Sequence, residues 1–139
     1  MMELFLCVRS TDSILYYPKN NPGHFRVKLP RPLILEGSWT VGLCEIHTST
    51  PMEVLPGLYS LHCKSCTGML THDLTSDVLR MVQPKRNVHV IYTCIYYMPI
   101  ETHFIESLEI YFKDSKGALV SLAEEGVLEC VLHFKRQNG

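Results

Sequence analysis

The chain has 139 residues, the usual size of one domain, so we expect residues 1–139 to form a single domain. Apolar residues make up 46% of the chain and charged residues 19%, which is enough for a core but leaves little charge for the surface and so favours an oligomer. The net charge of −1 excludes a strong overall attraction to nucleic acid or to an anionic membrane, and no apolar run approaches the roughly 18 residues that a spanning helix needs.

Short apolar runs separated by turn residues fill the chain, and this pattern predicts an all-β fold. In the first half the predicted strands are Met2–Val8, Ser13–Tyr17, His24–Leu29, Leu33–Leu35, Trp39–Ile46 and Leu58–Cys63. Pro30 and Pro32 bracket a predicted corner between the third and fourth of these strands. Residues 48–56 form a predicted loop with two prolines.

Trp39–Ile46 is the strongest predicted core strand. Strict alternation places Val41, Leu43 and Glu45 on one face and the even-numbered residues, Ile46 included, on the other. Glu45 is therefore an anomaly on a dry face, and we expect it to be a strand-end residue that reaches water or a partner.

The second half continues the same pattern. Cys66–Thr75 is polar and predicted to be irregular. Val88–Met98 is rich in β-branched and aromatic residues and is predicted to be a long strand that is buried on both faces for part of its length. The remaining predicted elements are Asp77–Val82 (a strand or one helical turn), Phe104–Phe112, a hairpin turn at Asp114–Gly117, Ala118–Leu122 and Val127–Phe134. No amphipathic helix is predicted. The fold class expected is a single jelly-roll β-sandwich of about eight antiparallel strands, although periodicity does not define strand order.

One cluster has the spacing of metal ligands. Cys63 and Cys66 form a C-x-x-C pair, and His72 or His62 could complete a zinc tetrahedron. A structural zinc site normally needs a second ligand pair at similar spacing, and none follows. We therefore expect no metal and no cofactor, and keep zinc bound by Cys63, Cys66 and His72 as the alternative.

Nothing in the sequence predicts catalysis. The seven histidines are scattered, most of them on the polar sides of strands, and there is neither a nucleophile elbow nor a phosphate-binding glycine loop. We expect a protein that is not an enzyme. The basic residues Arg26, Lys28, Lys135 and Arg136 are interpreted as solvated positions, so no specific nucleic-acid site is expected.

A resemblance to a known family begins with the motif N-P-G-x-F-x-V-x-L from Asn21 to Leu29 and continues with G-x-W-x-V-G-L-x-E-I from Gly37 to Ile46. Further matching segments are Leu79–Val82, Tyr96–Ile100, Ile105–Ile110, Lys113–Gly117 and Val131–Arg136. Together they cover about two-thirds of the chain. The sequence resembles penton-type minor capsid proteins encoded by Polinton (Maverick) elements, adintoviruses and adomaviruses.

The resemblance implies a single jelly roll that forms a homopentamer at icosahedral fivefold vertices and contacts a major capsid protein. It also implies a location in the virion capsid, after synthesis in the host cytoplasm and assembly in the nucleus. Related proteins are often longer after the tryptophan strand, and the short connection at residues 48–56 keeps a capsid cement protein open as a second assignment. A zinc- or ligand-binding β-sandwich adaptor and a small cupin-like enzyme are two further candidate functions.

An assembling protein needs apolar groups at its contact surfaces. The candidates that lie in or near predicted loops are Tyr16, Tyr17, Met52, Leu55, Met69, Tyr97 and Met98.

Overall fold

The computed structural model describes residues 2–67, 70–73, 79–100 and 103–137; for residues 65–67 and 70–73 only the backbone is described. The described residues form β-strands, turns and loops. The strands are β1 (Glu3–Arg9), β2 (His24–Ile34), β3 (Trp39–Thr48), β4 (Tyr59–Thr67), β5 (Leu70–Asp73), β6 (Arg80–Val82), β7 (His89–Ile91), β8 (Met98–Ile100), β9 (Phe104–Lys113) and β10 (Leu128–Arg136). Within this part of the chain, no helix has the length and apolarity to cross a membrane.

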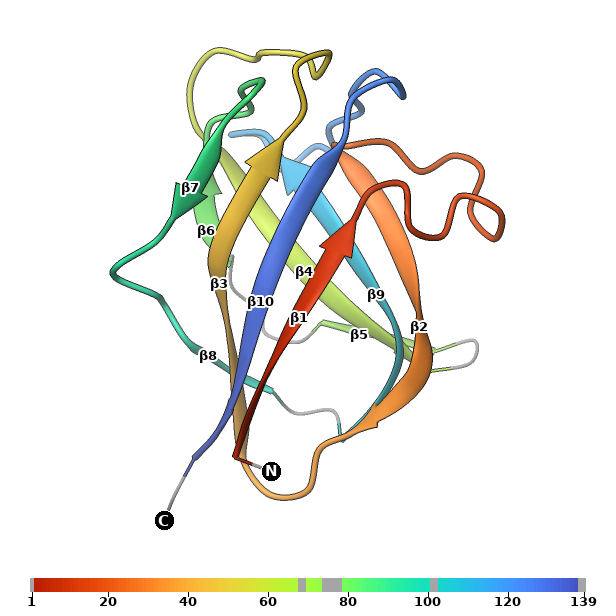
Figure 1. Cartoon of the computed structure of the whole chain (residues 1–139), viewed down its shortest axis with the longest axis vertical. Helices are drawn as coiled ribbons and strands as arrows, with labels where there is room; N and C mark the ends of the chain where they lie inside the picture. Colours follow the sequence, from red (N-terminus) through yellow and green to blue (C-terminus); the bar gives the residue numbers. More distant parts are fainter. Residues whose placement is uncertain (1, 68–69, 74–78, 101–102, 138–139) are drawn as a thin grey trace.

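The strands form two antiparallel sheets packed face to face (Figure 1). In the first, called the β1 sheet, the order is β1-β10-β3-β7, and β8 pairs with β3 on the same side as β7. In the second, called the β2 sheet, the order is β2-β9-β4-β5, and β6 also pairs with β4. The prediction of an all-β, two-sheet sandwich is therefore confirmed.

The hydrophobic core lies between the two sheets. Alternate residues of each strand point inward, and Phe25, Phe112 and Phe134 are among the largest side chains that are almost completely buried. Burying one such side chain stabilises the folded state by about 1.5–3 kcal/mol. Because β9 and β10 are interior strands with partners on both sides, they supply many of the fully buried positions.

A β-bulge in β3 explains the anomalous position of Glu45. The register with β10 shifts so that Leu132 lies opposite Leu43 while Val131 lies opposite Glu45, which leaves Cys44 as the extra residue. After the bulge the phase of alternation is reversed, and Ile46 belongs to the core. The predicted faces are therefore wrong beyond Leu43. Glu45 is half-buried, and its Oε1 lies 2.7 Å from Nε2 of His89.

The apolar run Val88–Met98 is not one long buried strand. The short strands β7 and β8 pair with the two ends of β3, at Glu45–His47 and Trp39–Val41 respectively. The segment between them crosses the outer face of β3 at Gly42, where an added Cβ would lie 2.5 Å from Cγ2 of Ile95. The prediction of a strand buried on both faces is wrong, because the run follows the edge of the sheet.

Ser13–Tyr17, predicted as a strand, is part of the loop between β1 and β2. The backbone N–H groups of Tyr16 and Tyr17 both donate to the carbonyl of Ser13, which makes a tight turn. The same loop covers the free edge of β2: Asn20 exchanges two side-chain hydrogen bonds with the backbone of Arg26, and Ser13 Oγ accepts from the N–H of Lys28. These bonds satisfy backbone groups that would otherwise be unpaired at a sheet edge.

Three further segments differ from their predicted structure. β2 runs through the predicted proline corner to Ile34, although its register with β9 is broken between Lys28 and Leu33; proline is tolerated there because β2 is an edge strand. The backbone of 66–67 and 70–73, predicted to be irregular, is paired in β4 and β5. Ala118–Leu122 forms an isolated bridge at Leu119 and no strand.

Candidate functional site

Large apolar side chains are exposed at several places on the sandwich, and two groups of them lie on opposite sides. We call the first group the loop patch, which lies in the loop between β1 and β2 and consists of Ile14, Leu15 and Tyr16. We call the second group the edge patch, which lies on β6, on β7 and in the segment before β8 and consists of Met81, Ile91 and Tyr96. Figure 1 shows the loop at the right of the molecule and the β6–β7 side at the left.

The loop patch presents one side chain almost entirely to solvent. Leu15 is 94% exposed, which is unusual for a leucine in a folded domain and creates a small apolar projection. The turn at Ser13 holds this projection, and Nζ of Lys28 lies 4.5 Å from the ring centre of Tyr16. The loop is therefore fastened to β2 on one side while Leu15 points away from the protein.

Arg80 links the two sheets beside the edge patch. Its guanidinium carbon lies 3.8 Å from the ring centre of Tyr92 and 5.1 Å from that of Tyr96, and its Nη1 donates to the carbonyl of Cys94 at 2.8 Å. Arg80 belongs to β6 in the β2 sheet, whereas the tyrosines follow β7 in the β1 sheet. This contact fixes the segment that carries Tyr96 across the open side of the sandwich.

Histidines on the outer face of the β1 sheet have structural partners. Nε2 of His133 donates to Glu3 at 2.7 Å, and its Nδ1 accepts from the hydroxyl of Tyr97 at 2.7 Å, while Phe5 stacks on the ring at 4.3 Å. Together they join β1, β10 and the segment before β8. No group of three or more potential metal ligands occurs among the described residues.

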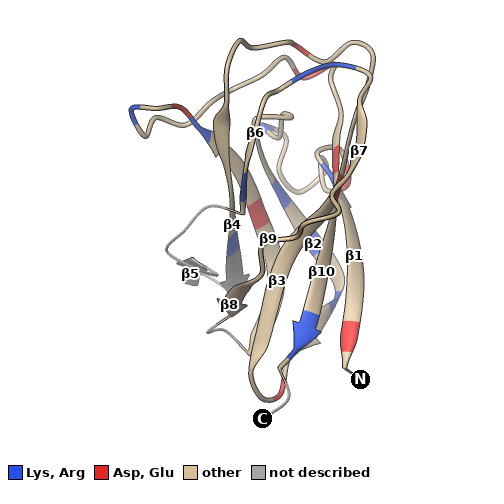
Figure 2. Cartoon of the chain, turned by 90° about the vertical axis from the view of Figure 1, so that its left-hand side faces the viewer, with Lys and Arg blue, Asp and Glu red and all other residues tan. Residues whose placement is uncertain are grey.

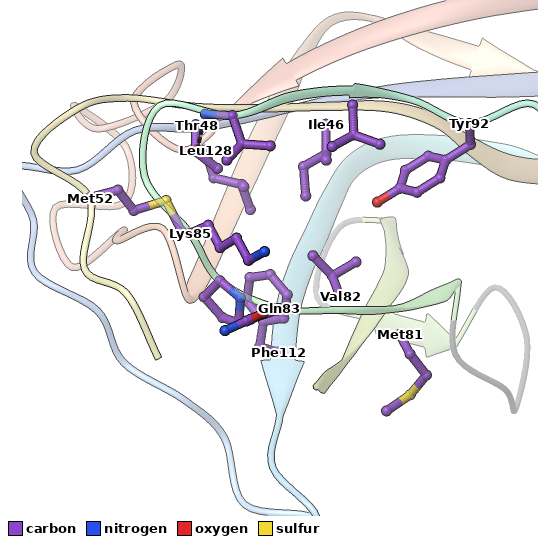
Figure 3. A pocket seen from close by; sticks show the side chains of 13 residues that line it. Ile46, Thr48, Met52, Met81, Val82, Gln83, Lys85, Tyr92, Phe112 and Leu128 are labelled. Atoms are coloured by element: carbon purple, nitrogen blue, oxygen red, sulfur yellow. Dashed lines mark hydrogen bonds between the residues drawn. The ribbon is translucent and has the colours of Figure 1, made fainter. Parts of the chain in front are cut away.

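One apolar pocket, of about 190 Å³, opens between the sheets beside β6 and β7 (Figure 3). It is lined from both sheets, by Val82 of β6, Phe112 of β9 and Leu128 of β10 among others, and Lys85 is its one charged lining residue. Burial raises the pKa of Tyr92, which also lines the pocket. The lining contains no carboxylate, thiol or imidazole, and so offers no pair for acid–base or nucleophilic chemistry.

Three of the described thiols have pKa values above the ordinary range. Burial raises the pKa of the Cys130 thiol to about 12, and burial also raises the pKa values of Cys7 and Cys44. A thiol needs a lowered pKa to act as a nucleophile near neutral pH. The pKa of Glu129 is lowered by the hydrogen bond from Arg9, which is a surface ion pair.

The predicted contact residues occupy three kinds of position. Tyr16 is exposed, as a contact residue requires, and Tyr97 is 36% exposed although its hydroxyl is bonded to His133. Half-buried positions are found for Tyr17, Leu55 and Met98. Met52 is fully buried in the core, so its assignment to a contact surface is corrected: it packs beneath Gly126 and beside the pocket. Met69 lies outside the described residues.

The structure describes only part of the candidate zinc site. Cys63 is buried in the hydrophobic core, whereas the side chains of Cys66 and His72 lie outside the described part of the chain. Zinc therefore stays a prediction. Leu15, Ile91 and Tyr96 were not predicted as contact residues, because each lies in an apolar run that resembles a buried strand; the adjacent Tyr16 and Tyr97 were the nearest signals.

The described residues form a two-sheet antiparallel β-sandwich with exposed apolar side chains, among them the loop patch and the edge patch. No protein-family model matches the chain, and no curated protein is significantly similar to it.

Proposed function

We propose that this protein is a jelly-roll structural subunit that assembles into a ring, as a penton-type minor capsid protein does. The observation that carries the proposal is the strand order. β5 and β6 pair with successive parts of β4, and β7 and β8 pair with successive parts of β3, so each couple acts as one interrupted strand. Counted in this way, eight strands follow the order 1-8-3-6 in one sheet and 2-7-4-5 in the other. This is the order expected for a jelly roll, the plan of many viral capsid domains.

The distribution of exposed apolar groups supports assembly into a ring. A contact between two different surfaces of the same chain is heterologous, and repeating it generates a closed ring when the rotation between copies closes. The loop patch and the edge patch are two such surfaces on opposite sides of the sandwich. Burial of Leu15 of one copy against the edge patch of the next would supply apolar contact area, with the surrounding polar residues fixing the register.

The chemistry of the described residues also favours a structural role. The pocket lining lacks a catalytic pair, and two described histidines of the β1 sheet have hydrogen-bond partners: His89 is bonded to Glu45, and His133 to Glu3 and Tyr97. Contact with a major capsid protein, the vertex position and the location in the virion follow from the family resemblance and belong to the proposal. The cement-protein assignment shares the fold but needs no ring.

The ring is tested by light scattering of the full chain during size-exclusion chromatography over a range of concentrations. We expect a closed oligomer for the wild type and monomers for both Leu15→Asp and Ile91→Asp, because each variant carries a charge in one patch. Leu119→Asp is the matched control, since Leu119 is also an exposed apolar residue but lies in neither patch.

Mixing the two monomeric variants makes the test specific to a heterologous contact. Leu15→Asp keeps an intact edge patch and Ile91→Asp keeps an intact loop patch, so the mixture should form a one-to-one dimer that cannot grow further. A monomeric wild type, both alone and with a co-expressed major capsid protein, would refute the penton assignment. A ring that both variants leave unchanged would show that other surfaces make the contact.

A further inference from the structure

The outer face of the β2 sheet is more basic than the rest of the protein. Strands β2, β4 and β9 carry five cations and two carboxylates, whereas β1, β3 and β10 carry three of each. These three strands hold five of the 13 lysines and arginines of the chain and have an excess of three positive charges, whereas the whole chain has a net charge of −1. In Figure 2, Lys and Arg are blue and Asp and Glu are red on the strands of both sheets.

Alternation turns four of these cations outward on one surface, which we call the basic face. Arg26 and Lys28 alternate on β2 with the buried Phe25 and Val27, while Lys64 follows the buried Cys63 on β4 and Lys113 follows the buried Phe112 on β9. Because the strands are paired neighbours in the order β2-β9-β4, these side chains share one continuous surface.

Aromatic rings and one carboxylate organise the basic face: Glu109 of β9 lies opposite Arg26 of β2 and Lys64 of β4, and rings lie beside the cations. Nζ of Lys28 lies 4.5 Å from the ring centre of Tyr16, the guanidinium of Arg26 lies 5.1 Å from Tyr17, and Nζ of Lys113 lies 5.6 Å from Tyr111. Within the described chain, no carboxylate forms an ion pair with Arg26, Lys28 or Lys113. A cation held over a ring keeps its charge available to an incoming anion.

The carboxylate of Glu109, which lies on this surface, has a hydrogen-bond partner. Oε2 of Glu109 lies 3.2 Å from Nε2 of His24, and that hydrogen bond, followed by the nearby positive charges, lowers the pKa of Glu109. Nε of Arg26 donates to Oγ of Ser107 at 3.1 Å, which orients the guanidinium on the sheet surface. The basic face thus combines oriented cations with an exposed ring, Tyr16, at its β2 margin.

We infer that the basic face binds single-stranded nucleic acid without sequence preference, its cations contacting backbone phosphates and Tyr16 stacking on a base. Proteins of this kind combine a positive surface that follows the backbone with aromatic rings that accept any base. The exposed ring beside Lys28 favours nucleic acid over an acidic protein, because carboxylate side chains gain nothing from a stacking surface. The cations belong to strands of each single copy, so the phosphate contacts do not depend on ring formation. Tyr16 is also part of the loop patch, so its stacking on a base is tested on the monomeric variant Ile91→Asp, in which no neighbouring copy covers it.

The test measures the fluorescence anisotropy of a labelled oligothymidylate with the full chain at increasing salt. Three phosphate contacts, by Arg26, Lys28 and Lys113, should give a slope of log affinity against log salt of about −2, since each contact contributes about −0.7 for single strands. Lys28→Gln and Lys113→Gln should each reduce that slope by about 0.7. Tyr16→Ala should weaken binding about tenfold.

Lys135→Gln is the matched control, because Nζ of Lys135 also lies 5.6 Å from a tyrosine ring, that of Tyr97, but on the β1 sheet. It should leave the affinity and the slope unchanged. Absence of binding at low salt, or an equal effect of Lys135→Gln and Lys113→Gln, would overturn the inference. Equal affinity for poly-glutamate, with the same dependence on Lys113, would also overturn it and assign the face to an acidic protein.

Discussion

Replacing Gly42 by alanine tests how the segment between β7 and β8 is held against the β1 sheet. An added Cβ at Gly42 would lie 2.5 Å from Cγ2 of Ile95, 2.9 Å from the carbonyl oxygen of Tyr96 and 3.2 Å from Cδ1 of Tyr97. Favourable carbon contacts are about 3.5–4.0 Å. The Ile95 side chain can rotate, but the Tyr96 oxygen belongs to the backbone, so the segment itself must move.

The expected cost is that of inserting one methyl group into a well-packed contact, about 1–3 kcal/mol. For a domain of this size the melting temperature should fall by about 3–10 °C. The sign of the change in the free energy of unfolding is informative, because alanine in a strand is normally more favourable than glycine by roughly 0.5–1 kcal/mol. Without the contact, Gly42→Ala would therefore be neutral or stabilising.

The assay is thermal and urea unfolding of four proteins: wild type, Gly42→Ala, Ile95→Ala and the double variant. Truncating Ile95 removes the closest atom, so Gly42→Ala should cost less in that background, with a coupling free energy of about 0.5 kcal/mol or more. Displacing the segment should also weaken the bond between Tyr97 and His133, visible as faster amide exchange in residues 92–97. A melting temperature equal to that of the wild type, with additive effects, would refute this account of the packing.

Three further predictions concern stability and reactivity. The hydrogen bond with His24 is the chief reason that the pKa of Glu109 lies below its ordinary value of 4.5. The free energy that ionised Glu109 contributes to the folded state is therefore present above pH 4.5 and is lost as the pH falls below that value. The melting temperature of Glu109→Gln should depend less on pH in that range. Cys130, with a pKa of about 12, should resist a thiol reagent at neutral pH, where about one thiol in 10⁵ is ionised, whereas the exposed Cys94 should be labelled first in peptide mass spectrometry. Asn20→Ala removes both hydrogen bonds to the β2 backbone and should lower the free energy of unfolding by about 1–3 kcal/mol in urea titrations.

Each of these has a contrary outcome. Identical pH profiles for wild type and Glu109→Gln would mean that the carboxylate contributes no folding free energy. Labelling of Cys130 as fast as that of Cys94 in the folded protein would contradict its burial. Unchanged unfolding of Asn20→Ala would mean that water replaces the side chain at the edge of β2 without cost.

The alternation of dry and wet residues predicted most of the interior strands, because the rule depends only on one strand facing one core. The rule failed where the pairing with a second strand determines which residues face the core. The bulge at Cys44 is a property of the register between β3 and β10, and its one local signal was the anomalous Glu45 on a dry face. The run Val88–Met98 looked buried because its composition is that of a core strand, yet it occupies a sheet edge where Ile91 is 65% exposed.

The candidate surfaces were harder to predict for the same reason. Leu15 and Ile91 are apolar residues inside apolar runs, and only the topology shows that these runs face solvent. Tyr16 was predicted because its ring lies beside turn residues, and Met52 was misassigned because a loop between two prolines was expected to be exposed. The basic face appears only when β2, β9 and β4 are placed side by side.

The interrupted outer strands restrict how copies of this protein can polymerise. An uninterrupted sheet margin can recruit strand after strand into a fibre with no fixed end. Here the β3 and β4 margins carry strands of three or four residues, and the β2 margin is occupied by Asn20 and Ser13. β1 is the remaining continuous margin among the described strands. Growth through backbone ladders is thereby discouraged, which leaves side-chain surfaces to determine how many copies an assembly contains.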